Sequence, residues 1–380
     1  QIAFGLDQPD YVLLRAPRPT LISSNTGDFF DIQGSWDNFR QAKRIYARLG
    51  FPERVDLVEV EGGHGVAPQN LATIAHWMRR WLLARDESVP ARELATRPAS
   101  ELLCTPTGQV LTSIEGERSV FDLNAAYELE LAQRRATLHG QEKADQLRDK
   151  IAKLLSVNLS GKRHPPSRDD RGRVERDGYH IDKLVLQTAS GALLPALTFH
   201  PESPVDEAYI HLHDDGKRGD SGTHGAIQRK VNGGYVVVSL DLRGQGETAS
   251  GKRDPVLSDW KTYYLGYLLG QPLVGLRVED LLAARDFVAH YEKQEGSLRK
   301  VHLVASGQSG IVALHAAALD PDSFESVTLR GTPRDWSTLL SQSYPRGQLD
   351  SAVHGALTTY DLPDLVRLAG KGKVRFADQE

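Results

Sequence analysis

A chain of 380 residues suggests two domains or slightly more, because one domain takes roughly 150 residues. Apolar residues make up 40% of the chain and charged residues 25%, which is ordinary for a globular protein and excludes disordered, collagen-like and disulfide-scaffold classes. The 46 basic and 50 acidic side chains give a net charge of −4, so no global basic surface recruits nucleic acid, and no apolar run predicts a membrane span.

The first stretch of the chain predicts the order strand, helix, strand, helix. Residues 19–26 predict a short buried strand, and residues 55–60 predict a second strand that runs into a glycine-rich loop. Between them, Ser35 can cap a helix that Gly50 ends, and the apolar spacing of residues 71–82 predicts a last helix. This alternation favours parallel strands in an α/β fold.

The middle of the chain has a different character. Residues 124–156 are charged and rich in Ala, Leu and Gln, which predicts one or two exposed helices. Residues 163–177 carry a basic cluster and alternating charges without interleaved aromatic residues, which favours a solvated connector over a nucleic-acid surface. We therefore expect a first domain at 1–87, a helical and charged linker region at 88–178 and a second domain at 179–380.

A second α/β series begins near residue 180. Its first two strands predict a hairpin around Ser190 and Gly191, and its later strands alternate with helices. The first strand of the chain and the last strand of this series both run into an acidic residue, Asp28 and Asp378 respectively. The predicted strands are 183–188, 193–200, 207–213, 235–241, 301–305, 326–330 and 373–377, and the predicted helices are about 221–232, 276–292 and 308–318.

Asp28 and His64 carry the clearest chemical signal. Each follows the carboxyl end of a predicted strand, where open α/β sheets gather their catalytic groups. An Asp followed by a loop His matches the tail of a Ser–Asp–His triad, in which the carboxylate fixes the tautomer of the imidazole. The alternative is an Asp in a helix-entry loop and an ordinary loop His. Asp31 is a second candidate for the acid, ranked below Asp28, because only coordinates show which carboxylate faces His64.

A serine nucleophile is the missing part of this triad. Folds of this kind present the serine in G-x-S-x-G, on a sharp turn between a strand and a helix. The one elbow-like segment is 304–310 (V-A-S-G-Q-S-G), and the register of its small residues places Gly307 at the nucleophile position. Ser306 and Ser309 each miss the centre of the turn. The segment therefore predicts an elbow without chemistry.

Two further segments are typical of such a second domain. Residues 211–216 (H-L-H-D-D-G) end one strand, where related folds place oxyanion-hole amides, and residues 241–248 (D-L-R-G-Q-G-E-T) follow the next strand. An ordinary pair of loop histidines is the alternative for the first segment. A metal site that uses Asp214 and Asp215 is disfavoured, because no spacing directs three ligands to one point. Cys104 is the single cysteine, which excludes a multi-thiolate zinc site.

Four segments together resemble the C-terminal third of α/β-hydrolases of the acetyl xylan esterase type, within the broader serine carbohydrate-esterase and prolyl-oligopeptidase-like group. They are 15–22 (R-A-P-R-P-T-L-I), 26–32 (T-G-D-F-F-D-I), 42–50 (A-K-R-I-Y-A-R-L-G) and 62–65 (G-G-H-G). The resemblance covers about residues 10–87, and the domain from about residue 180 looks like a second hydrolase-like domain. It implies an α/β-hydrolase fold with a mostly parallel sheet, helices on both faces, and two units of which the first is incomplete.

The resemblance also implies a function. Asp28 and His64 would be the acid and base of a serine esterase that removes acyl groups, acetyl in the first instance, from a polysaccharide such as xylan through an acyl-enzyme. The expected partner is an ester or polysaccharide substrate, no metal or organic cofactor is required, and a secreted or periplasmic location is implied. The sequence departs from the family in one respect, because the G-x-S-x-G serine and the oxyanion loop expected before Asp28 are absent.

Two arrangements explain this departure. Met78 is the single methionine and the chain opens at Gln1, which predicts that this is not an intact translation product. In the favoured arrangement the chain is the C-terminal part of a tandem protein, whose N-terminal part holds the serine and whose second domain is catalytically dead. The other is a circularly permuted hydrolase, which would leave Gly307 where the serine must be. Two rival functions stay open: a non-catalytic binding or scaffold module, and a prolyl-oligopeptidase-like peptidase.

Overall fold

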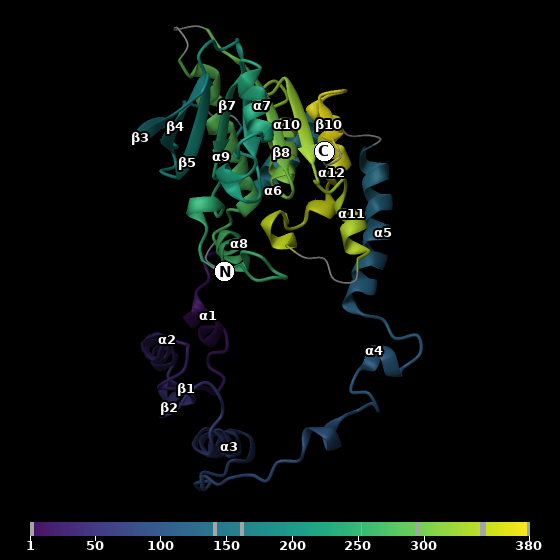
Figure 1. The fold of residues 1–380 in the computed structure, drawn as a ribbon. Coiled ribbons are helices and arrows are strands. Elements are labelled where there is room, and N and C mark those ends of the chain that lie inside the picture. Colours follow the sequence, from purple (N-terminus) through teal and green to yellow (C-terminus); the bar gives the residue numbers. More distant parts are fainter. Residues whose placement is uncertain are drawn as a thin grey trace. The chain divides into compact units, whose positions relative to one another are not determined.

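The computed structural model describes residues 4–139, 143–159, 163–251, 253–292, 297–342 and 347–377. The chain divides into two compact units, Gln1–Glu115 and Gly116–Glu380, which are called unit 1 and unit 2 below (Figure 1). Asp378, which we expected after the last strand, lies outside the described residues.

Unit 1 is built on two parallel strands. β1 (Thr20–Asn25) pairs with β2 (Val55–Val60) in a register that sets Thr20 against Val55 and Asn25 against Val60. The strands alternate with helices as the sequence predicts. The helices of this unit are α1 (Gln8–Leu13), α2 (Ile32–Arg48), α3 (Pro68–Leu83) and α4 (Val110–Ser113).

A small core joins α2 to this sheet. Ala42 and Tyr46 of α2 and Val55 of β2 are fully buried against one another. α2 begins at Ile32, earlier than the Ser35 cap that we expected, because the Asp31 carboxylate accepts a hydrogen bond from the Gln33 amide. A carboxylate cap satisfies one of the amide groups that a helix leaves unpaired at its first turn.

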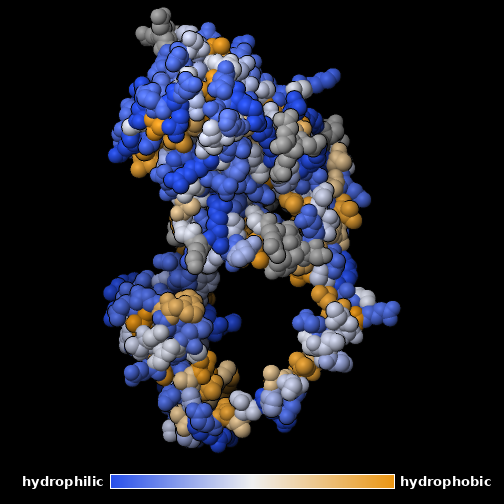
Figure 2. Space-filling model, in the orientation of Figure 1, coloured by the Kyte–Doolittle hydropathy of each residue, from blue (hydrophilic) through white to orange (hydrophobic). Residues whose placement is uncertain are grey.

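Unit 1 keeps much apolar surface exposed. Phe29 and Phe30 are 74% and 65% exposed, and Met78, Leu82 and Leu83 of α3 are 53%, 73% and 61% exposed. Apolar side chains appear as orange patches on an otherwise mostly blue surface in Figure 2. A two-stranded sheet is marginally stable without further strands or covering helices. Additional strands packed on this unit would bury its exposed apolar side chains.

Unit 2 contains an eight-stranded sheet in the order β10-β9-β8-β6-β7-β5-β4-β3. β3, β4 and β5 are antiparallel neighbours, β5 is antiparallel to β7, and the remaining pairs are parallel. The sheet is therefore mostly parallel apart from one edge. The strands are β3 (Ser167–Arg176), β4 (Tyr179–Gln187), β5 (Leu193–Pro201), β6 (Glu207–Leu212), β7 (Val236–Leu240), β8 (Lys300–Ser306), β9 (Ser326–Arg330) and β10 (Val374–Ala377).

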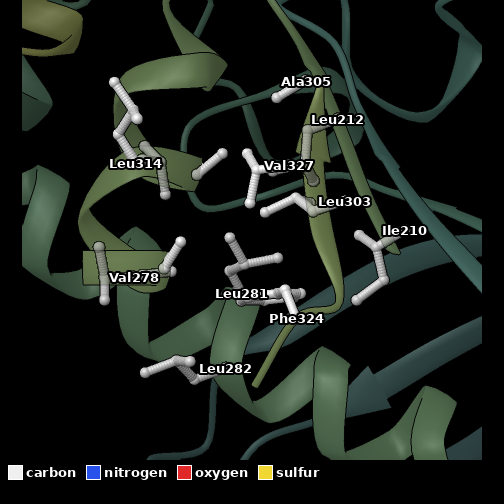
Figure 3. Packing of buried hydrophobic residues seen from close by; sticks show 14 of the residues in the cluster. Ile210, Leu212, Val278, Leu281, Leu282, Leu303, Ala305, Leu314, Phe324 and Val327 are labelled. Atoms are coloured by element: carbon white, nitrogen blue, oxygen red, sulfur yellow. The ribbon is translucent and has the colours of Figure 1, made fainter. Parts of the chain in front are cut away.

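Helices cover both faces of this sheet. α9 and α10 pack on one face, where Val278, Leu281 and Leu282 of α9, Leu314 of α10 and strand residues of β6, β8 and β9 belong to one buried cluster (Figure 3). α7 packs on the other face, against β5 and β7. The helices of this unit are α5 (Val120–His139), α6 (Ala144–Leu155), α7 (Ala226–Asn232), α8 (Trp260–Leu268), α9 (Leu273–His290), α10 (Ser309–Leu319), α11 (Trp336–Leu340) and α12 (Leu362–Ala369).

Two local expectations differ from the structure. The charged segment that we expected to be a connector contains β3, whose side chains are almost all exposed at the sheet edge. Such a strand buries no apolar face, so the alternation that predicts strands is absent, although Arg173 pairs with Asp182 of β4. The helix expected from residue 221 begins only at Ala226, behind two glycines. The hairpin around Ser190 and Gly191 is confirmed.

None of the helices in the described part of the chain has both the length and the apolar content that crossing a bilayer requires.

Candidate functional site

Asp28 and His64 lie together in unit 1. The imidazole Nδ1 of His64 is 3.1 Å from Oδ1 and 3.0 Å from Oδ2 of Asp28. The carboxylate side chain is only 14% exposed, whereas the imidazole is 59% exposed. The backbone amide of Phe30, which donates to Oδ1, is the main cause that lowers the pKa of Asp28. The arrangement is a shielded, ionised carboxylate that holds one nitrogen of an accessible imidazole.

The parallel pairing of β1 and β2 brings these two residues together. Both loops leave the sheet at the carboxyl ends of adjacent strands, and the Gly27 amide donates to the Gly62 carbonyl oxygen at 2.9 Å. A Cβ on Gly27 would lie 3.0 Å from that oxygen, so a side chain there would push the two loops apart. Glycine at this position permits the close approach of the two loops.

Two buried asparagines hold the histidine loop in place. The Asn25 side-chain amide donates to the carbonyl oxygens of Gly63 and Gly65 at 2.7 and 2.8 Å, on either side of His64. Asn70 of α3 donates to the Asn25 side-chain oxygen at 3.0 Å and accepts from the Ala67 amide at 2.9 Å. The sequence analysis did not identify this pair. A polar residue at the buried end of a strand was its only sequence signal.

Asp31 does not contact His64 in this arrangement, because its carboxylate caps α2. The ring of Phe29 instead lies beside the imidazole, with a centroid separation of 4.4 Å. Asp28 is therefore the carboxylate that faces His64.

The elbow-like segment of unit 2 joins β8 to α10. Gly307 lies at the turn with a φ of +69°. Residues other than glycine adopt this backbone conformation only at a cost in free energy. The Thr332 hydroxyl donates to the Gly307 carbonyl oxygen at 3.0 Å and braces the turn. The segment has the strand–turn–helix geometry of a nucleophile elbow, with glycine at the nucleophile position.

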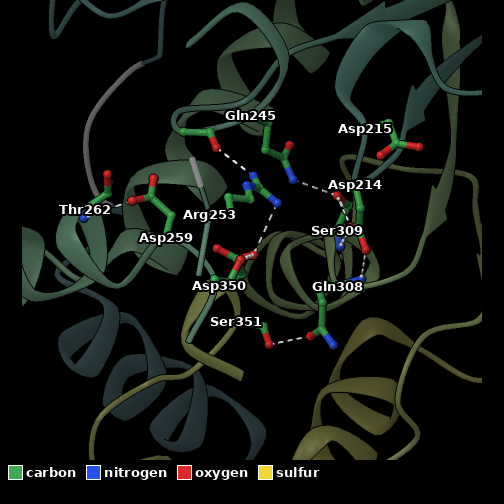
Figure 4. Close-up of polar contacts among 12 residues, drawn as sticks. Asp214, Asp215, Gln245, Arg253, Asp259, Thr262, Gln308, Ser309, Asp350 and Ser351 are labelled. Carbon is green, nitrogen blue, oxygen red and sulfur yellow. Dashed lines mark hydrogen bonds and ion pairs between the residues drawn. The ribbon is translucent and has the colours of Figure 1, made fainter. Parts of the chain in front are cut away.

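The Asp214 carboxylate occupies the space beside this turn (Figure 4). It accepts from the Gln308 amide at 2.9 Å, from the Ser309 amide at 2.8 Å and from the Ser309 hydroxyl at 2.9 Å. In a working elbow, the amide that follows the nucleophile helps to bind the oxyanion. Here the corresponding Gln308 amide binds a carboxylate of the protein itself.

The two serines of the segment differ in their surroundings. Ser309 is 1% exposed, and its hydroxyl donates to Asp214 and accepts from the Gln245 side-chain amide at 2.9 Å. A buried hydroxyl with both roles engaged is a structural group at the start of α10. Ser306 is half-buried and lines a pocket with His213, Asp220 and Arg330.

The remaining polar segment of the sequence has a structural role. Asp241 is fully buried and accepts from the Lys217 side chain at 2.5 Å and from the Glu247 amide at 2.9 Å. Within the described residues, no group of three or more His, Cys, Asp or Glu side chains is arranged to hold a metal ion.

Comparison with known proteins bears on the fold. No family model matches the chain, and no curated protein matches it in sequence. Among solved structures, a Bacteroides fragilis protein assigned as an acetyl xylan esterase superposes with a TM-score of 0.50 and 14% identity, over 62% of this chain and 66% of that one. Acetyl xylan esterase 1 from Thermoanaerobacterium and the acetyl xylan esterase from Paenibacillus sp. R4 each give a TM-score of 0.41 at 16% identity. They match 63% and 62% of this chain, and 86% and 87% of their own chains.

The decisive observation is a mostly parallel sheet with helices on both faces and an elbow after β8, together with the first of these superpositions. The chain has an α/β-hydrolase fold. The expectation of that fold is therefore confirmed. At this level of identity the likeness establishes the fold alone.

Proposed function

We propose that this chain is part of a serine esterase of the α/β-hydrolase type, which removes acyl groups, acetyl in the first instance, from a polysaccharide such as xylan. Asp28 and His64 of unit 1 are the acid and base of its triad, and the serine lies outside these 380 residues, in an N-terminal part of the same protein. A secreted or periplasmic location belongs to the same proposal.

The contact between Asp28 and His64 supports this proposal most directly. Both carboxylate oxygens lie within 3.1 Å of Nδ1, and within the described residues no hydrogen bond engages Nε2 of the exposed ring. A triad needs this asymmetry, because one nitrogen must be fixed and the other must reach a serine hydroxyl. The apolar surface that unit 1 leaves exposed is consistent with further sheet packing against it.

The chemistry follows from these roles. A serine oxygen attacks the ester carbonyl while His64 takes the serine proton at Nε2, and Asp28 stabilises the imidazolium that forms. His64 then gives the proton to the alcohol oxygen of the sugar as that oxygen leaves, so the acyl group remains on the serine. Water, activated by His64 in the same way, releases the acyl group as a carboxylic acid. None of these steps requires a metal or an organic cofactor.

A second candidate is a non-catalytic binding or scaffold module. One observation favours it: the Asp214 carboxylate accepts from the Gln308 amide at the elbow-like turn, where Gly307 lies at the position of a serine nucleophile. This observation concerns unit 2, and it does not bear on the Asp28–His64 pair of unit 1.

Fluorophosphonate labelling of the complete protein, followed by peptide mapping, tests both candidates. A labelled serine outside these 380 residues supports the esterase proposal. A label on the peptide that contains Ser306 and Ser309 overturns it in favour of a self-sufficient, circularly permuted hydrolase. The absence of any label favours the non-catalytic module. Among labelled outcomes, turnover of acetylated xylan but not of a prolyl peptide separates an esterase from a prolyl-oligopeptidase-like peptidase.

A further inference from the structure

Unit 2 contains a polar pocket of about 400 Å³ beside the elbow. Its wall is formed by His213 after β6, Ser306 at the end of β8, Gly307 in the turn that follows, and Arg330 at the end of β9, with Asp214 and Asp220 from the loop that follows β6. These are carboxyl ends of parallel strands, where open α/β sheets bind their ligands. The volume lies in the range of small-molecule sites.

The pocket cannot perform the chemistry of an elbow. Gly307 supplies no nucleophile, and a Cβ at that position would lie 2.0 Å from Oδ2 of Asp214. Asp214 in turn holds the amides of Gln308 and Ser309, so these donors are not free to bind an oxyanion. The elbow therefore offers a ligand in this pocket neither a nucleophile at position 307 nor free oxyanion donors.

The remaining side chains offer both donors and acceptors. Nδ1 of His213 accepts from the Asp215 amide at 3.0 Å, so the neutral ring carries its proton on Nε2 and can donate from there. Arg330 supplies a guanidinium, and its Nη1 lies 3.8 Å from Oδ2 of Asp220 in a loose ion pair. The Ser306 hydroxyl can donate or accept.

The carboxylate of Asp220 has a lowered pKa at this wall of the pocket. The buried ring of His211 lies behind it, with Nε2 3.3 Å from Oδ2, and this neighbour is the main cause that lowers the pKa of Asp220. The backbone of Asp220 has a φ of +58°, which Asp tolerates better than most residues. The adjacent Gly219 lets the loop pack on His213, because a Cβ there would lie 2.2 Å from the ring.

This set of groups selects among ligand classes. An anion would face the carboxylates of Asp214 and Asp220, and an organic cation would face Arg330. An apolar ligand finds no large apolar side chain in the wall. Hydroxyl groups both donate and accept, so a neutral polyhydroxylated molecule can satisfy carboxylate, guanidinium and imidazole together.

We propose that the pocket beside the elbow of unit 2 binds a neutral saccharide without transforming it. Asp220 and Arg330 hold adjacent hydroxyl groups, and His213 and Ser306 bind from the sides. Unit 2 then supplies a saccharide site formed by its own residues. The choice of xylan as the saccharide to test rests on the proposed function, whereas the saccharide class rests on the pocket.

Isothermal calorimetry of the 380-residue chain with unacetylated xylohexaose tests this site. We expect saturable binding, weakened at least tenfold by Asp220→Asn and by Arg330→Gln, which corresponds to about 1.4 kcal/mol or more. Arg375→Gln removes the same charge from an exposed position on β10 and should leave the affinity within twofold. Loss of affinity in Asp220→Asn and Arg330→Gln, with Arg375→Gln unaffected, assigns the signal to unit 2.

Further variants and probes keep the outcome decisive if one substitution unfolds the protein. Circular dichroism identifies a variant that is unfolded, and Arg330→Lys or Ser306→Trp is then used in its place. Arg330→Lys keeps the positive charge but lacks the guanidinium group, and Ser306→Trp fills the pocket. No saturable binding, or equal affinity in all pocket variants, overturns the proposal. Binding of acetate or inorganic phosphate in place of xylohexaose, lost in Arg330→Gln, overturns it in favour of an anion site. Because no esterase activity is measured, the result is independent of the triad.

Discussion

The Asp214 carboxylate and a side chain at position 307 exclude one another. Oδ2 of Asp214 lies 2.0 Å from the place where a Cβ on Gly307 would stand, and it accepts from the Gln308 amide at 2.9 Å. A nucleophile at the turn and the bound carboxylate therefore cannot coexist without movement of the loop. The turn after β8 therefore carries no side chain at position 307, and the Asp214 carboxylate fills the space beside it.

This exclusion predicts a coupled pair of substitutions. Gly307→Ser should destabilise the protein by about 2 kcal/mol or more, because it adds an atom against Asp214 at a φ of +69°. Asp214→Ala should cost about 1–3 kcal/mol, because three hydrogen bonds are lost at the start of α10. The double variant should cost at least ~1 kcal/mol less than the sum, because the clash disappears with the carboxylate. Urea unfolding of the four proteins measures this coupling, and simple additivity would contradict it.

A second prediction concerns the asparagine that holds the histidine loop. Asn25→Asp replaces an amide that donates to the Gly63 and Gly65 carbonyls by a carboxylate that faces those same oxygens. We expect a loss of about 2–4 kcal/mol in the stability of unit 1, because one oxygen of the buried carboxylate would face two carbonyl oxygens while only Asn70 still donates to the other. Gln41→Glu adds the same charge at an exposed position of α2 and is the control.

Hydrogen exchange of the amides around His64, compared between these two variants, gives the result. Faster exchange in Asn25→Asp alone is the expected outcome. Equal protection in both variants would mean that Asn25 does not hold the loop.

A third prediction separates the two candidate acids. In the complete protein, Asp28→Asn and His64→Ala should each lower kcat/KM on an acetylated substrate by at least about 10³-fold, because the imidazole loses its fixed tautomer or is removed. Asp31→Asn is the matched control, since asparagine also caps helices and Asp31 does not contact His64. The kcat/KM of Asp31→Asn should stay within about threefold of the value for the unmodified protein. Turnover near that of the unmodified protein in Asp28→Asn would remove Asp28 from the triad.

A fourth prediction uses the buried His315 of α10. Burial lowers its pKa to about 4 from 6.5, and its ring contacts the Ile311 carbonyl oxygen and the Tyr360 hydroxyl, both at 2.7 Å. Below pH 6.5 the unfolded chain binds a proton that the folded protein does not, so stability falls as the pH drops from about 6.5 to about 4. The loss is about 3 kcal/mol, at roughly 1.4 kcal/mol per pH unit.

Asp280 titrates in the same window with the opposite sign, because burial raises its pKa to about 6 and the folded protein takes up the proton first. The measurement is therefore a difference in the free energy of unfolding between the unmodified protein and His315→Gln, from pH 7 to pH 4. That difference should shrink by about 3 kcal/mol, since only the unmodified protein titrates at this position. A difference that does not change with pH would show that the pKa of His315 is the same in the folded and the unfolded protein.

The sequence predicted most strands closely, for a physical reason. β7, β8 and β9 bury apolar side chains in regular alternation or in continuous runs, and burial leaves that pattern in the sequence. β3 was missed because an exposed edge strand buries nothing and reads as a charged connector. The start of α2 was misplaced by a few residues, because two polar residues, Asp31 and Ser35, could each cap it and tertiary context decided between them.

The sequence alone determined which residue types were at hand: Asp28 and His64 after successive strands, glycine in place of serine at an elbow, and no thiolate cluster. Only the tertiary structure decided which carboxylate meets His64, because Asp28 and Asp31 differ in direction and not in spacing. It also decided the role of Asp214, whose contacts with Gln308 and Ser309 join residues more than ninety positions apart. Periodicity records which side of an element is buried, whereas the meeting of two loops depends on how strands pair in the folded sheet.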